Sequence, residues 1–170
     1  RRRTRLEDRP CTGDQVAVGV SGFSARPVQG LPEVDEGFKL GAAIAELAEL
    51  TSGDVVVISQ KVVSKAEGRS VDLGSVSPGE EARELAGRVG KDPRLVELIL
   101  GEAESVVRTD EGRGILITAT RHGFICANSG IDASNVQGED TVLLLPQDAD
   151  ESARRIRAEI EAATSVRPAV

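Results

Sequence analysis

Apolar and polar positions recur along most of the chain in patterns that predict both helices and strands. The apolar residues between Leu40 and Ala48 have helical spacing, and Ser52-Gly53-Asp54 ends that helix. Val55–Ile58 is a β-branched run typical of a buried strand. Two Pro-containing segments predict further helix starts: Ser77 caps one helix with Pro78 in its first turn, and Asp92-Pro93 repeats this device. One face of the second of these helices is expected to carry Leu95, Leu98, Ile99 and Val106.

The last third of the chain predicts three strands and a long helix. Ile115–Ile117 and Phe124–Cys126 are expected to be strands, and Thr141–Leu145 another that ends at Pro146. Asp148 or Asp150 caps the final helix, whose inward positions are Ala153, Ile156, Ile160 and Ala163. Arg167–Val170 has the pattern of an entry to one more strand, so the domain is expected to be truncated at its C-terminus.

Helices and strands mix throughout, which predicts an α/β (mixed α+β) fold. We expect one compact unit over residues 26–170. Residues 1–25 begin with an arginine cluster and are predicted to be an N-terminal extension. The extension is expected to be a flexible tail, and the alternative is that its arginines contact phosphates.

Composition excludes several classes of function. The chain has 170 residues, a net charge of −7 and 39% hydrophobic residues, so it can build a core and is a poor nucleic-acid binder. Its apolar runs are too short to span a membrane. Cys11 and Cys126 match neither a zinc spacing nor a disulfide scaffold, which favours a cytoplasmic protein with free thiols. P-loop, Rossmann and hydrolase-elbow motifs are absent from the sequence.

Two segments carry candidate chemistry. Gln60–Arg69 places lysines directly after a predicted strand, where open sheets bind ligands, and lysine suits phosphate oxygens; the alternative is a solvated loop. Arg121–Val136 presents Asp132 and Asn135 in a turn. Asp132 suits Mg²⁺ or Mn²⁺, and Asn135 suits a base edge or an oxygen, whereas an Asx turn is the alternative for both.

Five ordered segments together resemble the coenzyme F420-0:L-glutamate ligase family, the γ-glutamyl ligases of F420 biosynthesis. The segments are Gly30–Glu33, Asp54–Arg69, Gly90–Leu100, Arg121–Val136 and Leu144–Arg157. The resemblance implies a GTP-dependent ligase that adds L-glutamate to F420-0 through a γ-linkage and an acyl-phosphate intermediate. It further implies Mg²⁺ or Mn²⁺, help from K⁺, a homodimer and the family's mixed α/β fold.

The resemblance also assigns roles to residues of this chain. Leu31, Pro32, Glu33 and Val34 match one GTP-contacting segment, Gln60, Lys61 and Lys65 match a second, and Asn135 matches a further nucleotide contact. Asp132 matches a divalent-metal ligand. No catalytic residue is assigned, and Ser64, Arg69, His122 and Asn128 are neighbours without a role. The alternatives are a non-catalytic fragment that binds GTP or phosphate, and an unrelated α/β domain.

Overall fold

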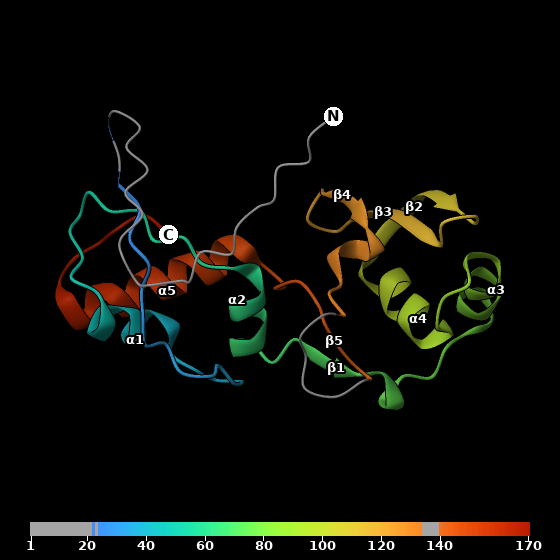
Figure 1. Ribbon diagram of the computed structural model, residues 1–170, viewed down its shortest axis with the longest axis horizontal. Helices are drawn as coiled ribbons and strands as arrows, with labels where there is room; N and C mark the ends of the chain where they lie inside the picture. Colours follow the sequence, from blue (N-terminus) through green and yellow to red (C-terminus); the bar gives the residue numbers. More distant parts are fainter. Residues whose placement is uncertain (1–21, 23, 134–139) are drawn as a thin grey trace, which may run out of the picture.

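The chain folds into two lobes joined by a narrow pair of strands (Figure 1). The computed structural model describes residue 22, residues 24–133 and residues 140–170. The helical lobe contains α1 (Leu40–Leu47), α2 (Gln60–Ala66) and α5 (Ala149–Thr164). The sheet lobe contains α3 (Glu80–Val89), α4 (Pro93–Glu102), β2 (Ala103–Asp110), β3 (Ile115–Thr120) and β4 (Ile125–Ala127). The mixed α/β class predicted from the sequence is confirmed.

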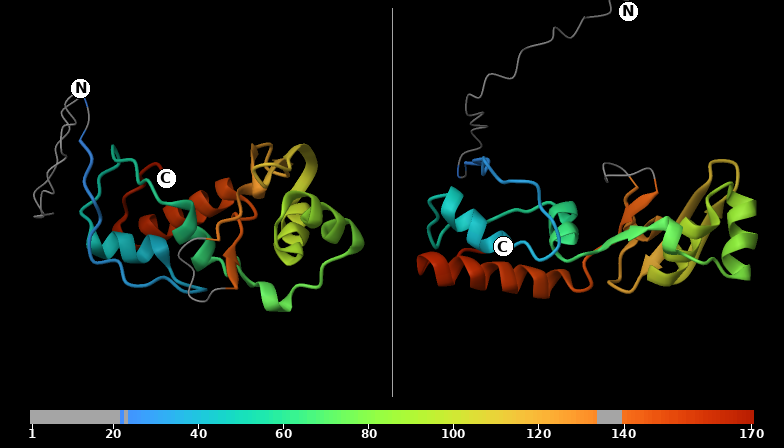
Figure 2. Two further views of the ribbon diagram at one scale, coloured as in Figure 1. Left: turned by 45° about the vertical axis from the view of Figure 1, so that its right-hand side comes forward. Right: turned by 90° about the horizontal axis from the view of Figure 1, so that it is seen from below.

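The helical lobe is held together by the packing of α1 on α5, which lies along one side of this lobe (Figure 2). The two helices approach so closely at Gly41 that a Cβ there would collide with the Ile156 carbonyl oxygen. The Gly41 amide also donates to Glu159 Oε2 at 2.8 Å. The buried apolar residues of this lobe pack into one core, which consists of Val34, Leu40, Ile44, Val56, Val63, Ile156 and Ile160.

The sheet lobe has its own apolar cluster. Its three strands are antiparallel in the order β2-β3-β4, and β3 alternates half-buried and buried side chains along its length. The buried members of the cluster come mainly from α3 and α4; they are Ala82, Leu85, Ala86, Val89, Val96, Ile99 and Leu116. Ala82 of α3, Val96 and Ile99 of α4 and Leu116 of β3 are fully shielded from solvent, so these three elements meet at the centre of this lobe.

A two-stranded ladder joins the lobes. β1 (Ser70–Asp72) pairs antiparallel with β5 (Thr141–Leu143), with Ser70 opposite Leu143. The Leu144 amide extends the ladder by donating to the Arg69 carbonyl at 3.0 Å. A 3-10 turn, η1 (Leu73–Ser75), then leads from β1 toward the sheet lobe. The chain therefore leaves the helical lobe through β1 and returns to it through β5.

Several predicted elements differ in the structure. Val55–Ile58 forms no named strand: Val55 makes a single parallel bridge to Ala169, and Val57 is 89% exposed. Val56 is buried in the core and Ile58 packs against it half-buried, so the β-branched run faces the core on one side only. The bridge to Ala169 fits the extended character expected for Arg167–Val170. β1 and β2 were not predicted, because β1 is short and β2 has largely exposed side chains.

Some of the helix boundaries predicted from the sequence differ from those in the structure. α3 begins at Glu80 with Gly79 rather than Ser77 as its N-cap, so Pro78 lies before the helix. α4 ends at Glu102, which places Val106 in β2 and off the predicted helix face. On α5, Ile156 and Ile160 are buried as predicted, but Ala163 is exposed. None of the described helices is long and apolar enough to cross a membrane.

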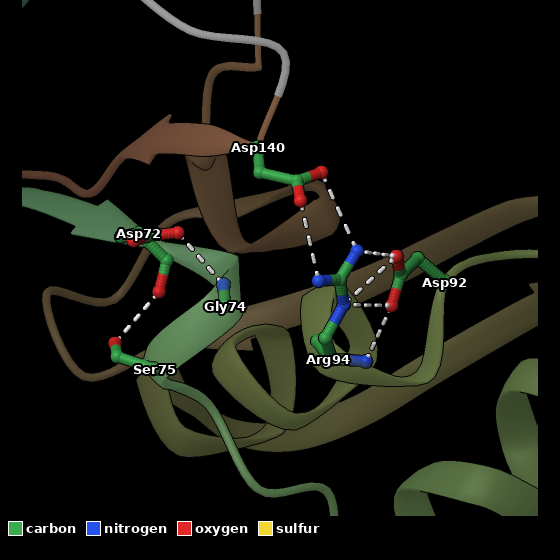
Figure 3. A network of polar contacts seen from close by, with 6 residues as sticks. All are labelled: Asp72, Gly74, Ser75, Asp92, Arg94 and Asp140. Carbon is green, nitrogen blue, oxygen red and sulfur yellow. Dashed lines mark hydrogen bonds and ion pairs between the residues drawn. The ribbon is translucent and has the colours of Figure 1, made fainter.

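Aspartates cap the N-termini of α4 and α5, the two helices for which the sequence predicted an aspartate cap. Asp148 accepts from the Glu151 amide at 2.8 Å, which makes it, rather than Asp150, the cap of α5. Asp92 caps α4 by accepting from the Arg94 amide at 2.8 Å. The Arg94 guanidinium bonds Asp92 and reaches Asp140 at 3.4 Å, so it connects the start of α4 to the residue before β5 (Figure 3).

We predict that Asp92→Ala lowers the free energy of unfolding by about 1 kcal/mol, because the substitution removes the cap of α4. The hydrogen bond from Arg94 lowers the pKa of Asp92 below its ordinary value of 3.8. The stabilisation should therefore be complete above that value and be lost as the pH falls through the lower pKa of the folded state. Urea unfolding at several pH values measures both effects. Asp35→Ala, at an exposed position, is the control; an equal loss in both variants would contradict the cap.

Candidate functional site

Helix α2 is the centre of the candidate site. Ser59 is its N-cap, and apolar Val63 anchors the helix in the core of the helical lobe. Lys61 and Lys65 are four residues apart, so they lie one turn apart on the same side of the helix. The sequence predicted a ligand site directly after a buried strand of an open sheet, with a solvated loop as the alternative. The structure corrects this, because a helix presents the lysines and no open parallel sheet precedes them in the described residues.

The first predicted GTP segment lies against this helix. Val34 is buried in the helical core and Leu31 packs against the same cluster, while Pro32 and Glu33 are exposed. Glu33 Oε1 accepts from Lys65 Nζ at 2.5 Å. Further along, the Gly37 amide donates to the Ala66 carbonyl at 2.9 Å. The structure therefore brings the segment of Leu31–Val34 and the second half of α2 together.

A second ion pair crosses between the lobes. Lys61 Nζ lies 2.7 Å from Asp132 Oδ2, with 36% and 23% of the two side chains exposed. The backbone of Asp132 exchanges hydrogen bonds with Leu143 of β5, at 2.9 and 2.8 Å. Gly130 turns the chain toward this position with φ +72°, and a Cβ there would lie 2.9 Å from Leu145 Cδ1. Backbone pairing and tight packing thus fix the carboxylate of Asp132 beside α2.

Two further residues were assigned to the site from the sequence, Gln60 and Asn135, and the structure describes only Gln60. Gln60 Nε2 donates to Ser64 Oγ at 2.6 Å and to the Leu144 carbonyl at 3.4 Å, so its amide faces the end of β5. Asn135 lies outside the described residues. The described part of the site therefore consists of Gln60, Lys61 and Lys65 on α2, with Glu33 and Asp132 supplying the carboxylates.

Arg69 is the residue whose importance the sequence did not show. Its Nε donates to the Leu145 carbonyl at 2.8 Å, and its guanidinium bonds Glu102 at 3.0 Å. Glu102 ends α4, so Arg69 ties the chain after α2 to the sheet lobe. The two side chains are only 17% and 22% exposed. The signal in the sequence was an arginine at the end of the basic segment, but its distant partners could not be identified from the sequence.

The described site contains two carboxylates, those of Asp132 and Glu33, and each is paired with a lysine of α2. The described part of the chain contains no group of three or more His, Cys, Asp and Glu side chains able to hold a metal ion. Mg²⁺ is usually bound by one or two carboxylates together with substrate phosphates. Asp132 fits one ligand of such an ion but not a complete protein cage.

Two further polar side chains precede Asp132 in the chain, His122 in the turn between β3 and β4 and Asn128 closer to Asp132. His122 Nε2 lies 2.9 Å from the Gln147 carbonyl oxygen. Within the described residues, His122 Nδ1 and Asn128 Oδ1 are buried without a hydrogen-bond partner. Asn128 begins η2 (Asn128–Gly130), whose Ser129 bonds Thr118 and the Ile99 carbonyl. These contacts make the turn a structural support for Asp132.

Comparison with known proteins identifies relatives of this chain. Residues 30–170 match the family described as F420-0:Gamma-glutamyl ligase. A Methanopyrus kandleri protein named Coenzyme F420:L-glutamate ligase is 47% identical over 139 residues, which are 82% of this chain and 54% of the relative. The Methanothermobacter thermautotrophicus protein of the same name is 43% identical over 148 residues, 84% of this chain and 58% of the relative. The chain spans about half the length of the curated relatives it matches.

We predict that Lys61 and Asp132 stabilise the fold jointly by up to about 1 kcal/mol, since the pair is only partly shielded from solvent. A double-mutant cycle with Lys61→Met and Asp132→Asn, followed by urea unfolding, measures this coupling. The coupling should shrink in high salt. Additive effects of the two substitutions would show that the ion pair does not hold the lobes together.

Proposed function

The chain belongs to the F420-0:gamma-glutamyl ligase family, and we propose that it carries the nucleotide-binding part of a GTP-dependent F420-0:L-glutamate ligase. The observation that carries the proposal is the meeting of Lys61, Lys65 and Asp132 at one surface of α2. Two cations and a fixed carboxylate are the groups that phosphoryl transfer requires, because its catalysis consists mainly of positioning and charge stabilisation. The names of the relatives supply the acceptor and the amino acid.

The proposed reaction proceeds in two transfers. A terminal carboxylate oxygen of F420-0 attacks the γ-phosphorus of GTP, the bond to the bridging oxygen breaks, and GDP leaves. The amino nitrogen of L-glutamate then attacks the acyl carbon, phosphate leaves, and the nitrogen loses a proton as the amide forms. The chain's lysines would hold phosphoryl oxygens in line and stabilise the charge that develops on them.

Substrate binding would require an exchange of ionic partners. In the structure each lysine of the site is paired with a carboxylate, Lys61 with Asp132 and Lys65 with Glu33. Phosphate oxygens would replace the carboxylates as partners of the two lysines. The released carboxylate of Asp132 would then face the cation that accompanies the nucleotide. The exchange replaces ion pairs with ion pairs, so it leaves no lysine unpaired in a partly buried position.

The other components of the proposal follow from the family assignment. Mg²⁺ or Mn²⁺ would neutralise phosphate charge with Asp132 as one protein ligand; K⁺, Asn135 as a nucleotide contact and a homodimer complete it. The substrates are small molecules, and the setting is the cytoplasm. A second candidate function is a fragment that binds GTP without turnover; in its favour, the described residues contain no group of three or more His, Cys, Asp and Glu side chains able to hold a metal.

We predict that Asp132→Asn abolishes metal-dependent ligation while the protein stays folded, because an amide replaces the anionic metal ligand. The assay is mass spectrometry of F420-0 incubated with the chain, GTP, Mg²⁺ or Mn²⁺, K⁺ and L-glutamate. The parent should yield products heavier by glutamyl units. Unchanged activity of Asp132→Asn would refute the metal role. A parent that GTP stabilises but that forms no product would favour the second candidate.

Lys65→Ala should weaken GTP binding by about 1.5–3 kcal/mol, the range for a hydrogen bond to a charged group. The rise in melting temperature with GTP and Mg²⁺ reports binding to the folded chain. Lys39→Ala is the matched control, because the Lys39 side chain is 75% exposed and lies 3.9 Å from Glu159 on α5. If both variants respond to GTP equally, Lys65 does not contact the nucleotide.

A further inference from the structure

Arg69 bonds both of the segments that bring the charged pair of the site together. Its amide donates at 2.9 Å to the carbonyl oxygen of Ser64, which lies on the same helix as Lys61. Its own carbonyl accepts from the Leu144 amide at 3.0 Å, and its Nε donates to the Leu145 carbonyl at 2.8 Å. This one residue therefore connects α2 to the two residues that follow β5, through its backbone and its side chain together.

Two routes lead from the residues after β5 to Asp132. The first is along the backbone, because Leu143, the last residue of β5, exchanges hydrogen bonds with Asp132 at 2.9 and 2.8 Å. The second is through packing, because the Leu145 side chain lies against Gly130, where a Cβ would come within 2.9 Å of it, two residues before Asp132. The position of the Asp132 carboxylate beside α2 therefore depends on the segment that the arginine holds.

The guanidinium of Arg69 is held by protein groups on two sides. Besides the bond from its Nε to the Leu145 carbonyl, its Nη2 donates to Glu102 Oε1 at 3.0 Å, and only 17% of the side chain is exposed. A guanidinium is a rigid plane whose separate N–H groups can hold two acceptors in one fixed orientation, whereas lysine has a single ammonium on a flexible stem. The arrangement therefore requires the shape of arginine as well as its charge.

We propose that Arg69 is a positioning residue of this site: it holds the segment after β5 against α2, so that the Asp132 carboxylate lies where it can bind the cation that accompanies the nucleotide. The proposal rests on the proposed function. Arg69 acts on the cation only through Asp132, by way of Leu143 and Leu145. Loss of a group that orients a metal ligand costs roughly 10–100-fold in metal affinity, and the indirect route through the backbone predicts about tenfold here.

The test is a calorimetric titration of GTP with excess Mn²⁺ into the 170-residue chain. Arg69→Lys keeps the charge beside Glu102 but not the planar fork, so it should weaken binding by about tenfold. The same substitution in an Asp132→Asn background should have no further effect, because the residue through which Arg69 acts is already changed. Arg88→Lys, which alters the Arg88–Glu111 pair of the sheet lobe, is the matched control, and circular dichroism checks that each variant is folded.

A second measurement needs no nucleotide. Arg69→Lys should abolish the coupling between Lys61 and Asp132 in urea unfolding, because the carboxylate is no longer held beside the lysine. Equal affinity for GTP with Mn²⁺ in Arg69→Lys and the parent would overturn the proposal, as would an equal loss with and without Asp132→Asn, which indicates a general structural role. A parent that binds no GTP refutes the proposed function instead. In that case loss of the coupling still supports the positioning of Asp132 by Arg69, and an unchanged coupling overturns it.

Discussion

The β1–β5 ladder and the Arg69 contacts at its end set the geometry on which the candidate site depends. α2 belongs to the helical lobe, whereas Asp132 follows the turn that leaves the sheet lobe. Asp132 is hydrogen-bonded to Leu143 of β5, so the 2.7 Å contact between Lys61 and Asp132 depends on the position of the ladder beside α2. Three residue pairs in the ladder and one half-buried guanidinium maintain that position. Removing this half-buried arginine should be destabilising, because the Glu102 carboxylate would stay half-buried without its ionic partner.

The electrostatics of the site follow from the same arrangement. Lysines one helical turn apart would repel each other if they stood alone, and each has a carboxylate at contact distance instead. The two carboxylates come from opposite sides, Glu33 from the segment before α1 and Asp132 from the sheet lobe. The surface of α2 is thus close to neutral without substrate, yet it contains the cations that a polyphosphate needs. An anionic ligand can bind there by changing partners rather than by burying new charge.

Local signals in the sequence were sufficient for elements whose stability is local. The Asp92-Pro93 cap and the periodic apolar residues of α1 and α5 predicted real helices, because capping and amphipathic spacing act within a few residues. Val55–Ile58 misled the prediction, because in the described residues the run makes only the single bridge from Val55 to Ala169 and a strand requires a continuous ladder. The family motifs selected Glu33, Lys65, Lys61 and Asp132 without their pairing. That pairing depends on contacts across the lobes, such as those of Arg69 with Leu145 and Glu102, which no local pattern encodes.

The strand order has a consequence for how the chain acquires its structure. The sheet lobe is an insertion between β1 and β5, and its hairpin and adjacent helices contact residues near them in the sequence. By contrast, α1 is completed by α5, and the hydrogen-bonded partners Gly41 and Glu159 are 118 positions apart. Contacts between neighbouring residues form faster than contacts across long loops. During synthesis on the ribosome, the sheet lobe can thus fold before α5 is available to cover the apolar face of α1. In that interval the exposed face of α1 is the part of the chain most prone to aggregate and to be bound by a chaperone.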